Sequence, residues 1–348
     1  MAGRAPSSKM QNKTPSLVKN CFEEGGSIHP LLIDPEITKH LSLCNASILE
    51  LKRDSKYLLN IRWVSYYLHH CEKDQKYQTP WGPLNYVRPD VDQRLRTENY
   101  ICDLDLQEMV PVNPRKIDES KFDPPAEWDF VGAEDVRLTT WDGDLYGSSV
   151  RRFAPQGEGR MQVSKLNLTP TSAVEKERFY IEAPLDPNAY CEKNWMPVLE
   201  EPFTYVKWCS PVEVVKANLD ITDSSTKRSP SFVIATGKDK LAPGIEARGG
   251  SQVVTYKGYY VALIHEVAGW HNKKNDRDAL YFHRFIVWDK KWNLVDYSDR
   301  FTFMHGRIEF CCGLASYKDS FLITFGFQDN GAYLFKMPKS YLDKLVKL

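Results

Sequence analysis

The chain has 348 residues, and its 46 Lys and Arg residues balance 46 Asp and Glu residues, so the formal net charge is zero. A balanced charge gives no basic field to attract nucleic acid or anionic lipid, which excludes functions that depend on one. The first 20 residues lack the apolar core of a signal peptide and no later run is long enough for a membrane span, so we expect a cytoplasmic protein.

The residue types indicate a mainly β protein. Tyr, Phe and Trp number 18, 16 and 9, while 21 Pro and 19 Gly residues separate short apolar runs rich in β-branched and aromatic side chains. The 8 cysteines show no CxxC spacing, which favours reduced thiols over disulfides or zinc. No motif requires a cofactor or a metal ion.

Two segments stand apart from the β-rich pattern. Residues 1–28 are polar and basic without hydrophobic periodicity, and we expect a flexible tail there. Residues 29–348 then form one domain. Two helices are predicted within it, one over residues 34–42 and one at the C-terminus, where Pro338 precedes an amphipathic segment.

Five segments resemble one another as the start of a repeating unit: residues 45–51, 133–139, 194–200, 250–256 and 309–315. Each opens a unit of roughly 55 to 90 residues, in which a turn and a second β-rich run follow. In the second unit the turn is Asp142-Gly143-Asp144, because a Gly between acids that separates two such runs is typical of a hairpin. Repeats of one small sheet each predict an all-β, five-bladed propeller with the opening strands around its axis.

In such a propeller, polar residues at the start of different blades converge on one axial pocket. Aromatic residues near these positions suit a ligand with apolar faces and hydroxyl edges, such as a sugar; they are Trp63, Tyr66, Trp195 and Tyr281. The charged and polar residues expected to face the pocket are Arg62, Glu134, Asp135, Arg137, Lys193, Asn194, Arg248, Gln252, His265, Glu266, His283, Arg284, His305, Glu309 and Asp329.

Asp135 is the first candidate for the chemistry of that pocket. Making or breaking a glycosidic bond requires an acid at the leaving oxygen, and a shielded carboxyl with a raised pKa can supply it. Strand alternation places the adjacent Glu134 on the opposite face, where it would orient an arginine or a sugar hydroxyl. The basic residues expected to hold sugar hydroxyls or an anionic leaving group are Arg62, Arg137, Lys193 and Arg248.

Structural roles compete with these assignments. Glu134 and Arg137 would form an ion pair between blades in one alternative, and Asp135 would cap the turn at the start of its strand in another. His265 and His283 have an equally simple alternative as hydrogen-bonded residues of inner strands. Each of these alternatives is decided by the partners of the side chain.

The segment GAEDVRL, followed by a hairpin and GSSVRR, resembles the G-x-E-D-P-R segment of five-bladed propeller enzymes that cleave or make β-mannosidic bonds, the β-mannoside phosphorylases and hydrolases. The related mannosyltransferases share this layout. Further matching segments, which cover most of the chain after residue 40, are SILELKRDSKYLLNIRWVSYY, EKNWMPV, ARGGSQVV, YFHRF, IEFCCGLA and ITFGFQDNGAYL. The chain departs from the family pattern at Asn45-Ala46, Ser65 and Val136, where the family has Asn-Pro, Asn and Pro.

The resemblance implies that Asp135 matches the family's proton donor and that Arg151 or Arg152 matches a phosphate-binding arginine. We therefore expect a glycosyltransferase or glycoside phosphorylase that forms or cleaves a β-mannosidic bond with inversion, with Asp135 as general acid/base. Its partners would be a sugar donor, either a nucleotide sugar or a sugar phosphate, and a glycan acceptor.

Two alternatives remain beside this function. An inverting glycoside hydrolase would need a second carboxylate about 6.5 to 9.5 Å from the first, and Glu309 or Asp329 is the candidate. A propeller that binds glycans without turnover is the other alternative, and it would need no catalytic carboxylate.

Overall fold

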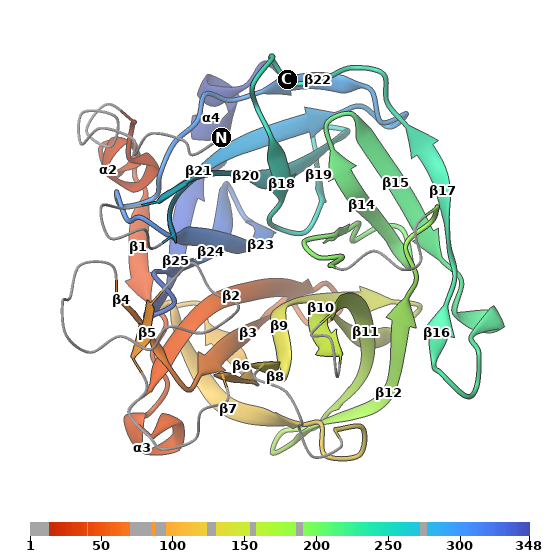
Figure 1. Cartoon of the computed structure of the whole chain (residues 1–348). Helices are drawn as coiled ribbons and strands as arrows, with labels where there is room; N and C mark the ends of the chain where they lie inside the picture. Colours follow the sequence, from red (N-terminus) through yellow and green to blue (C-terminus); the bar gives the residue numbers. More distant parts are fainter. Residues whose placement is uncertain are drawn as a thin grey trace.

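The computed structural model describes residues 14–39, 41–69, 85–87, 95–123, 130–153, 158–185, 191–271 and 277–348. Strands dominate, and the sheets are arranged around a common centre (Figure 1). This arrangement confirms an all-β, propeller-like fold. The strands fall into successive runs in which each strand is hydrogen-bonded to the next.

The first two runs share one ten-stranded sheet. One contains β2 (Ser42–Leu51), β3 (Lys56–Val64), β6 (Leu95–Asp105) and β7 (Val110–Asp118), and the other contains β9 (Ala133–Trp141), β10 (Asp144–Phe153), β11 (Glu158–Leu168) and β12 (Ala173–Ile181). They are joined because the outer strands β7 and β12 pair in parallel over two residues. Two short strands, β8 (Phe130–Val131) and β16 (Arg228–Ser229), add to β6 and β12.

The next two runs form separate sheets. One contains β13 (Met196–Pro197), β14 (Thr204–Cys209), β15 (Val212–Ala217) and β17 (Ser231–Thr236), with the short helix η1 (Leu219–Ile221) between β15 and β16. In the other, β18 (Ala247–Gly249) and β19 (Val254–Tyr256) both pair with β20 (Tyr259–His271), which is followed by β21 (Arg277–Trp288) and β22 (Leu294–Tyr297). A separate two-stranded sheet contains β4 (Tyr67–His69) and β5 (Asn85–Val87).

The last run closes the ring with strands from both ends of the chain. It contains β23 (Glu309–Tyr317), β24 (Ser320–Phe327), β25 (Gly331–Pro338) and, at its outer edge, β1 (Ser27–Pro30). The predicted unit starts coincide with β2, β9, β13, the β18–β19 region and β23. Contacts between β2, β9 and β23 bring the starts of distant units together at the centre.

Local predictions hold where turn chemistry is strong. The hairpin between β9 and β10 turns at Asp142 and Gly143, which both have positive φ, as a tight turn of this kind requires. The C-terminal helix is α4 (Lys339–Leu345), with Pro338 at its N-cap. The other predicted helix is shorter than expected: α3 (Pro35–Thr38) ends because Lys39 adopts the left-handed conformation.

The expectation of a flexible tail does not hold for residues 14–28. They contain helix α2 (Leu17–Phe22), whose apolar side chains pack into the core around Phe301 and Phe303. Ser16 caps this helix and also donates a hydrogen bond to the carbonyl oxygen of Phe303. The order of this segment was not predicted because the helix has only one apolar face and is too short to show hydrophobic periodicity in the sequence. Residues 1–13 lie outside the described part of the chain.

Leu17→Ala is expected to lower the free energy of unfolding by about 2 to 4 kcal/mol, because it leaves a cavity beneath α2. Urea unfolding followed by tryptophan fluorescence measures this. Phe22→Ala on the same helix is the matched control, since Phe22 is half exposed and should change stability little. Equal stability of both variants and the wild type would mean that α2 does not dock in solution.

Seven cysteines of the described residues are free: Cys21, Cys44, Cys102, Cys191, Cys209, Cys311 and Cys312. Cys71 lies outside those residues. Within the same part of the chain, no helix is long and apolar enough to cross a membrane, and no group of three or more His, Cys, Asp or Glu side chains is placed to hold a metal ion.

Candidate functional site

β-Bulges in two inner strands shape the centre of the molecule. Asn45 and Ala46 on β2 oppose the single residue Ile61, and Asp135 and Val136 on β9 oppose Ser149. Asn45 and Asp135 both have positive φ, at 41° and 55°, which Asn and Asp tolerate better than most residues. Bulges of this kind redirect side chains, and here they turn Asn45 and Asp135 toward each other.

Asp135 is held by residues of the first run. Its Oδ1 accepts hydrogen bonds from Arg62 Nη1 and Asn45 Nδ2, each at 2.9 Å. The Arg62 and Asp135 side chains are only 7% and 13% exposed, so the ion pair is shielded from water. Arg62 is fixed in turn because its Nε donates to Thr97 Oγ1 at 3.0 Å.

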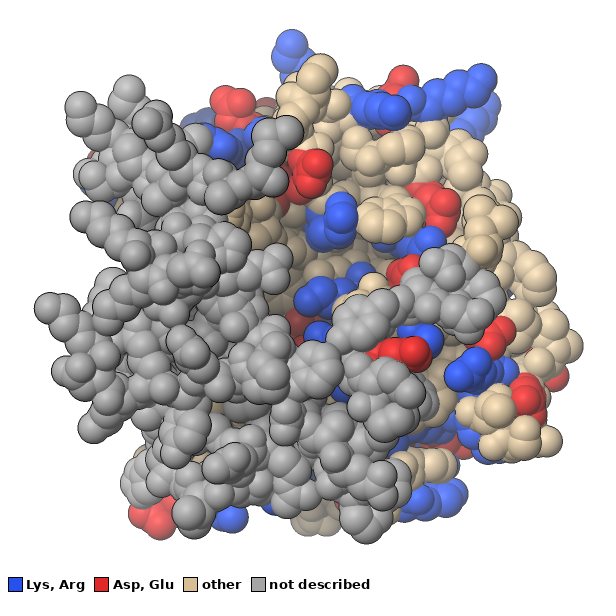
Figure 2. All heavy atoms as spheres, in the orientation of Figure 1, with Lys and Arg blue, Asp and Glu red and all other residues tan. Residues whose placement is uncertain are grey.

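A second carboxylate belongs to the same cluster. Tyr66 lies 3.5 Å from Arg62 Nη2 and donates its hydroxyl hydrogen to Asp329 Oδ2 at 3.3 Å. Asp329 comes from the turn between β24 and β25, which places residues of the first, second and last runs in one group. Basic and acidic atoms are gathered in the hollow of the face seen in Figure 2.

The two carboxylates experience opposite electrostatic environments. Burial acts to raise the pKa of Asp135, but Arg62, Arg137 and the Asn45 hydrogen bond outweigh it, and the pKa is lowered. Burial dominates at Asp329 and raises its pKa, with the neighbouring Asp135 charge acting in the same direction. The expectation of a raised pKa at Asp135 is therefore wrong. Its partners come from other units, and they keep it ionised.

Further positive charge acts on Asp135 from Arg137 and Lys193. Arg137 donates from Nε to the carbonyl oxygen of Gly250 at 2.6 Å and from Nη1 to the carbonyl oxygen of Asp135 at 2.9 Å. Its Nη2 is buried and has no hydrogen-bond partner among the described residues. The exposed Lys193 adds a charge that lowers the pKa of both Asp135 and His265.

His265 lies beside these cations as a neutral imidazole. Burial, Lys193 and Arg137 lower its pKa to about 3. Its Nδ1 lies 3.0 Å from the carbonyl oxygen of Gly249, and the ring stacks on Tyr281. Burial raises the pKa of Tyr281 to about 12, and the charges of Asp329 and Asp135 add to the rise, so this ring belongs to the cluster.

Several residues predicted to face the pocket instead form hydrogen bonds within the protein. Gln252 donates from Nε2 to the carbonyl oxygens of Ile48 and Leu138, and its Oε1 accepts from the backbone N–H of Leu314. One amide group thus links β2, β9 and β23. Trp195 is fully buried and donates to Glu192 Oε2.

Glu309 and His283 also have structural partners. The carboxylate of Glu309 accepts backbone N–H bonds from a loop of the preceding unit, at Phe303, Met304 and Gly306. Burial nevertheless raises its pKa to about 7. His283 is buried, stacks on Phe301 and accepts from the backbone N–H of Cys311 at 3.4 Å.

Other predicted residues lie away from the Asp135 cluster or show no contact with it. Arg151 forms ion pairs with Glu119 and Asp123 at 2.9 and 2.8 Å. Glu266 pairs with Arg284. Arg248 lies over the exposed ring of Trp208. His305 Nδ1 is 3.3 Å from Thr302 Oγ1, and the carbonyl oxygen of Asn194 packs against Gly249.

Glu134 lies just before the bulge at Asp135, and the charges of both acids act on Arg62 and on Asp329. Glu134 also lies 4.0 Å from Arg152 Nε, so its contact is with Arg152 and the alternative of an ion pair with Arg137 is not observed.

Sequence reasoning missed Asn45 as a site residue. The signal was present, because Asn45 lies at the start of the first unit and Asp135 close to the start of the second, and both residue types tolerate positive φ. The link from Tyr66 to Asp329 had no such signal, since it joins the two ends of the chain.

Gln252→Leu is expected to lower the free energy of unfolding by about 2 to 4 kcal/mol, because it removes three hydrogen bonds at the centre and leaves buried backbone groups unpaired. Urea unfolding measures the loss. Gln107→Leu is the control, as Gln107 is exposed in a turn. A stable Gln252→Leu protein that fails only in sugar binding would restore the predicted substrate role.

No protein-family model matches the sequence, and neither does any curated protein. Solved structures do match. A β-1,2-mannobiose phosphorylase from Listeria innocua aligns over 92% of this chain and 93% of its own, at 11% identity and a TM-score of 0.50. A glycoside hydrolase candidate from Parabacteroides distasonis aligns over 94% and 96%, at 12% identity and a TM-score of 0.54.

The chain shares the fold of these proteins. A GH130 glycoside hydrolase that targets β-1,2 mannosidic linkages in Candida mannan also aligns, over 86% of this chain and 85% of its own, at 11% identity and a TM-score of 0.50. The resemblance to β-mannoside phosphorylases and hydrolases is thus confirmed at the level of the fold. At these identities the activity has to be argued from the site.

Proposed function

We propose that the chain is a five-bladed propeller enzyme that transfers a glycosyl group with inversion at the cluster around Asp135, and that the bond is β-mannosidic. The observation that carries the proposal is the pair of central carboxylates with opposite pKa shifts, Asp135 and Asp329, linked through Arg62 and Tyr66. Opposed environments of this kind separate base from acid in glycosyl chemistry. The fold shared with mannoside-active enzymes supports the sugar assignment.

In the transfer direction, Asp135 acts as general base. Its carboxylate takes the proton of the acceptor hydroxyl while that oxygen attacks the anomeric carbon of the donor. The bond from this carbon to the leaving oxygen breaks, and its electron pair stays on a phosphate oxygen. A single displacement inverts the anomeric configuration. In the reverse direction, Asp135 first takes up a proton, phosphate attacks the anomeric carbon, and Asp135 delivers the proton to the departing sugar oxygen.

The leaving group explains why a base is sufficient for transfer. A phosphate or nucleoside diphosphate departs as an anion and needs positive charge rather than a proton. Arg137 and Lys193 supply that charge, and the buried Nη2 of Arg137, which has no hydrogen-bond partner among the described residues, would donate to a phosphate oxygen. This division of roles favours a transferase or a phosphorylase.

Inverting hydrolysis is the second candidate, and the raised pKa of Asp329 favours it. A protonated Asp329 would deliver the proton to the leaving sugar oxygen, while Asp135 would activate water on the opposite face of the ring. Asp329→Asn separates the two functions, since it should abolish hydrolysis and leave transfer from an anionic donor largely intact.

A donor screen tests the proposed function. The protein is incubated with nucleotide sugars, with sugar 1-phosphates, and with manno-oligosaccharides with and without phosphate, and products are read by mass spectrometry. Product that depends on GDP-mannose identifies a transferase, product that depends on phosphate a phosphorylase, and product that needs neither a hydrolase. Sugar binding without product under every condition would overturn the proposal in favour of a glycan-binding propeller.

A further inference from the structure

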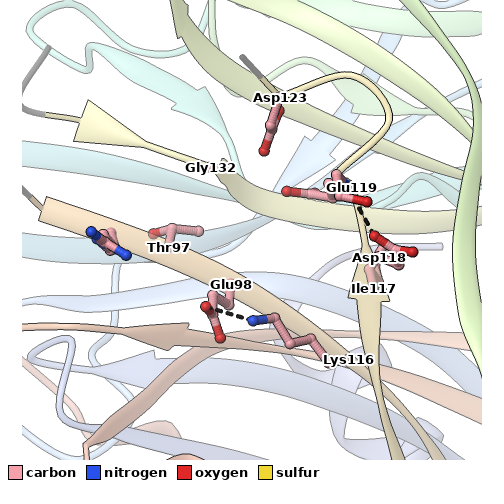
Figure 3. A pocket seen from close by; sticks show the side chains of 10 residues that line it. Thr97, Glu98, Lys116, Ile117, Asp118, Glu119, Asp123 and Gly132 are labelled. Atoms are coloured by element: carbon pink, nitrogen blue, oxygen red, sulfur yellow. Dashed lines mark hydrogen bonds and ion pairs between the residues drawn. The ribbon is translucent and has the colours of Figure 1, made fainter. Parts of the chain in front are cut away.

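A cavity of about 480 Å³ lies between the first two runs of strands (Figure 3). Its volume falls in the range that holds small ligands. Its walls come from the start of β6, the end of β7, the segment that follows β7, and the residue before β9. Among the described lining residues are Thr97, Glu98, Lys116, Glu119, Ser120 and Asp123.

Two lining residues connect the cavity to the reacting groups. Thr97 accepts the hydrogen bond from Arg62 Nε, and Arg62 holds Asp135. Gly132 has a φ of 99° and lies so close to β6 that a Cβ would be 2.0 Å from the Thr97 carbonyl oxygen. Because only glycine fits there, β9 starts directly against β6. Thr97 thus belongs both to the wall of the cavity and to the hydrogen-bond network that holds Asp135.

The lining offers hydrogen-bond acceptors that are already held in place. Glu98 pairs with Lys116 at 2.7 Å, and Arg151 holds Glu119 at 2.9 Å and Asp123 at 2.8 Å. Figure 3 shows Glu119 and Asp123 on one side of the cavity and the Glu98–Lys116 pair on the other. Each of these contacts engages one carboxylate oxygen. The second oxygen of each carboxylate remains an acceptor, and sugar hydroxyls are donors that match it.

The charge of the lining selects between the two substrates. Among its described residues, four are acidic and two, Arg96 and Lys116, are basic, and Lys116 is already paired with Glu98. An anionic donor would meet carboxylates here, whereas Arg137 and Lys193, whose charges act on Asp135, are not among the described residues that line the cavity. A neutral glycan has no such conflict. The described lining is thus suited to an uncharged sugar, whereas the cations whose charges act on Asp135 are suited to an anion.

We propose that this cavity is the acceptor subsite of the enzyme: it binds neutral sugar residues that adjoin the reacting sugar of the glycan acceptor. The proposal rests on the proposed function for the identity of the acceptor. It predicts that the cavity contributes to binding an oligosaccharide and contributes nothing to binding the donor or a monosaccharide.

Ser120→Trp tests the assignment, because it places a large ring in the cavity from an exposed turn. The KM for mannotetraose is expected to rise about tenfold, while the KM values for the phosphorylated donor and for mannose stay within twofold. Lys121→Trp is the matched control, since Lys121 is the neighbouring exposed residue and does not line the cavity. An unchanged KM for mannotetraose in Ser120→Trp would overturn the acceptor subsite.

Titration calorimetry with mannotetraose, on the wild type and both variants, keeps this test separate from that of the function. Tetraose binding that is lost only in Ser120→Trp, without turnover of any donor, supports the cavity and refutes the transferase. Turnover of a donor, with a tetraose KM that Ser120→Trp leaves unchanged, supports the transferase and refutes the acceptor subsite. Should Ser120→Trp fail to fold, the double variant Glu98→Ala/Lys116→Ala on the opposite wall should raise the tetraose KM about fivefold, and no rise would sink the proposal.

Discussion

Asp135→Asn is expected to lower kcat by about 10² to 10⁴ with little change in KM, because the substitution removes the group that moves the proton and keeps the shape of the side chain. Asn also tolerates the positive φ of this position, and its Oδ1 can still accept from Asn45. Steady-state kinetics with the donor and acceptor from the screen measure the loss. The melting temperature should fall by a few degrees, since Arg62 loses its shielded partner.

Asp144→Asn is the control for this prediction. Asp144 lies at the far end of the hairpin, is half exposed and pairs with Lys165, so turnover should stay near that of the wild type. If Asp135→Asn folds and keeps full activity, Asp135 is not the base and Asp329 takes its place as the candidate. If it unfolds, Asp135 has the structural role of a strand cap.

The repeat pattern made the fold predictable, because each unit can be recognised from its local sequence. Short β-rich runs, Gly and Asp at turns, and an opening strand recur along the chain, and the start of the second unit at Ala133 coincides with that of β9. The packed helix within residues 14–28 could not be predicted in this way. One short helix with a single apolar face gives too few residues to establish a period, and its burial depends on the distant Phe303.

The position of Asp135 could be predicted, but its ionisation could not. Its local sequence indicates a carboxyl at the start of an inner strand, and burial alone would raise the pKa. The decisive partner, Arg62, lies 73 residues earlier in another unit. Sign and size of a pKa shift depend on such partners, which the order of residues does not reveal.

Counting polar residues at the axis overestimates the number that can face a ligand. Gln252 and Glu309 were expected to face the pocket. Both side chains instead form hydrogen bonds with backbone groups of bulged strands and loops. A closed ring of inner strands leaves amides and carbonyls without ladder partners where the strands are irregular, and buried groups of this kind must be paired. Some polar residues at the centre are therefore required by the fold itself.

Arg62→Met is expected to damage both activity and stability, because it leaves Asp135 buried without its main counter-charge. Burial would then dominate and raise the pKa of Asp135. The base form would be lost at a higher pH than in the wild type, so the acid limb of the kcat/KM profile should shift upward by at least about one pH unit. Breaking a buried ion pair should also cost about 3 to 5 kcal/mol of unfolding free energy at neutral pH.

The sign of the stability change follows from the lowered pKa of Asp135. A carboxyl whose pKa is depressed by folding stabilises the protein above its unfolded pKa of about 3.9, and this contribution is lost as pH falls through the folded value. The deficit of Arg62→Met should therefore be largest near pH 7 and shrink in acid. Urea unfolding at several pH values, beside pH–rate profiles, measures both effects.

Arg115→Met provides the matched control, since Arg115 is another buried arginine of the first run and pairs with Asp103 away from the Asp135 cluster. It should lose stability and keep the wild-type pH–rate profile. The double variant Arg62→Met/Asp135→Asn should regain part of the stability of Arg62→Met, because no buried carboxylate is left without a partner, and should remain inactive. A wild-type acid limb in Arg62→Met would show that Arg62 does not set the ionisation of the catalytic group, and the assignment of Asp135 as the base would fall with it.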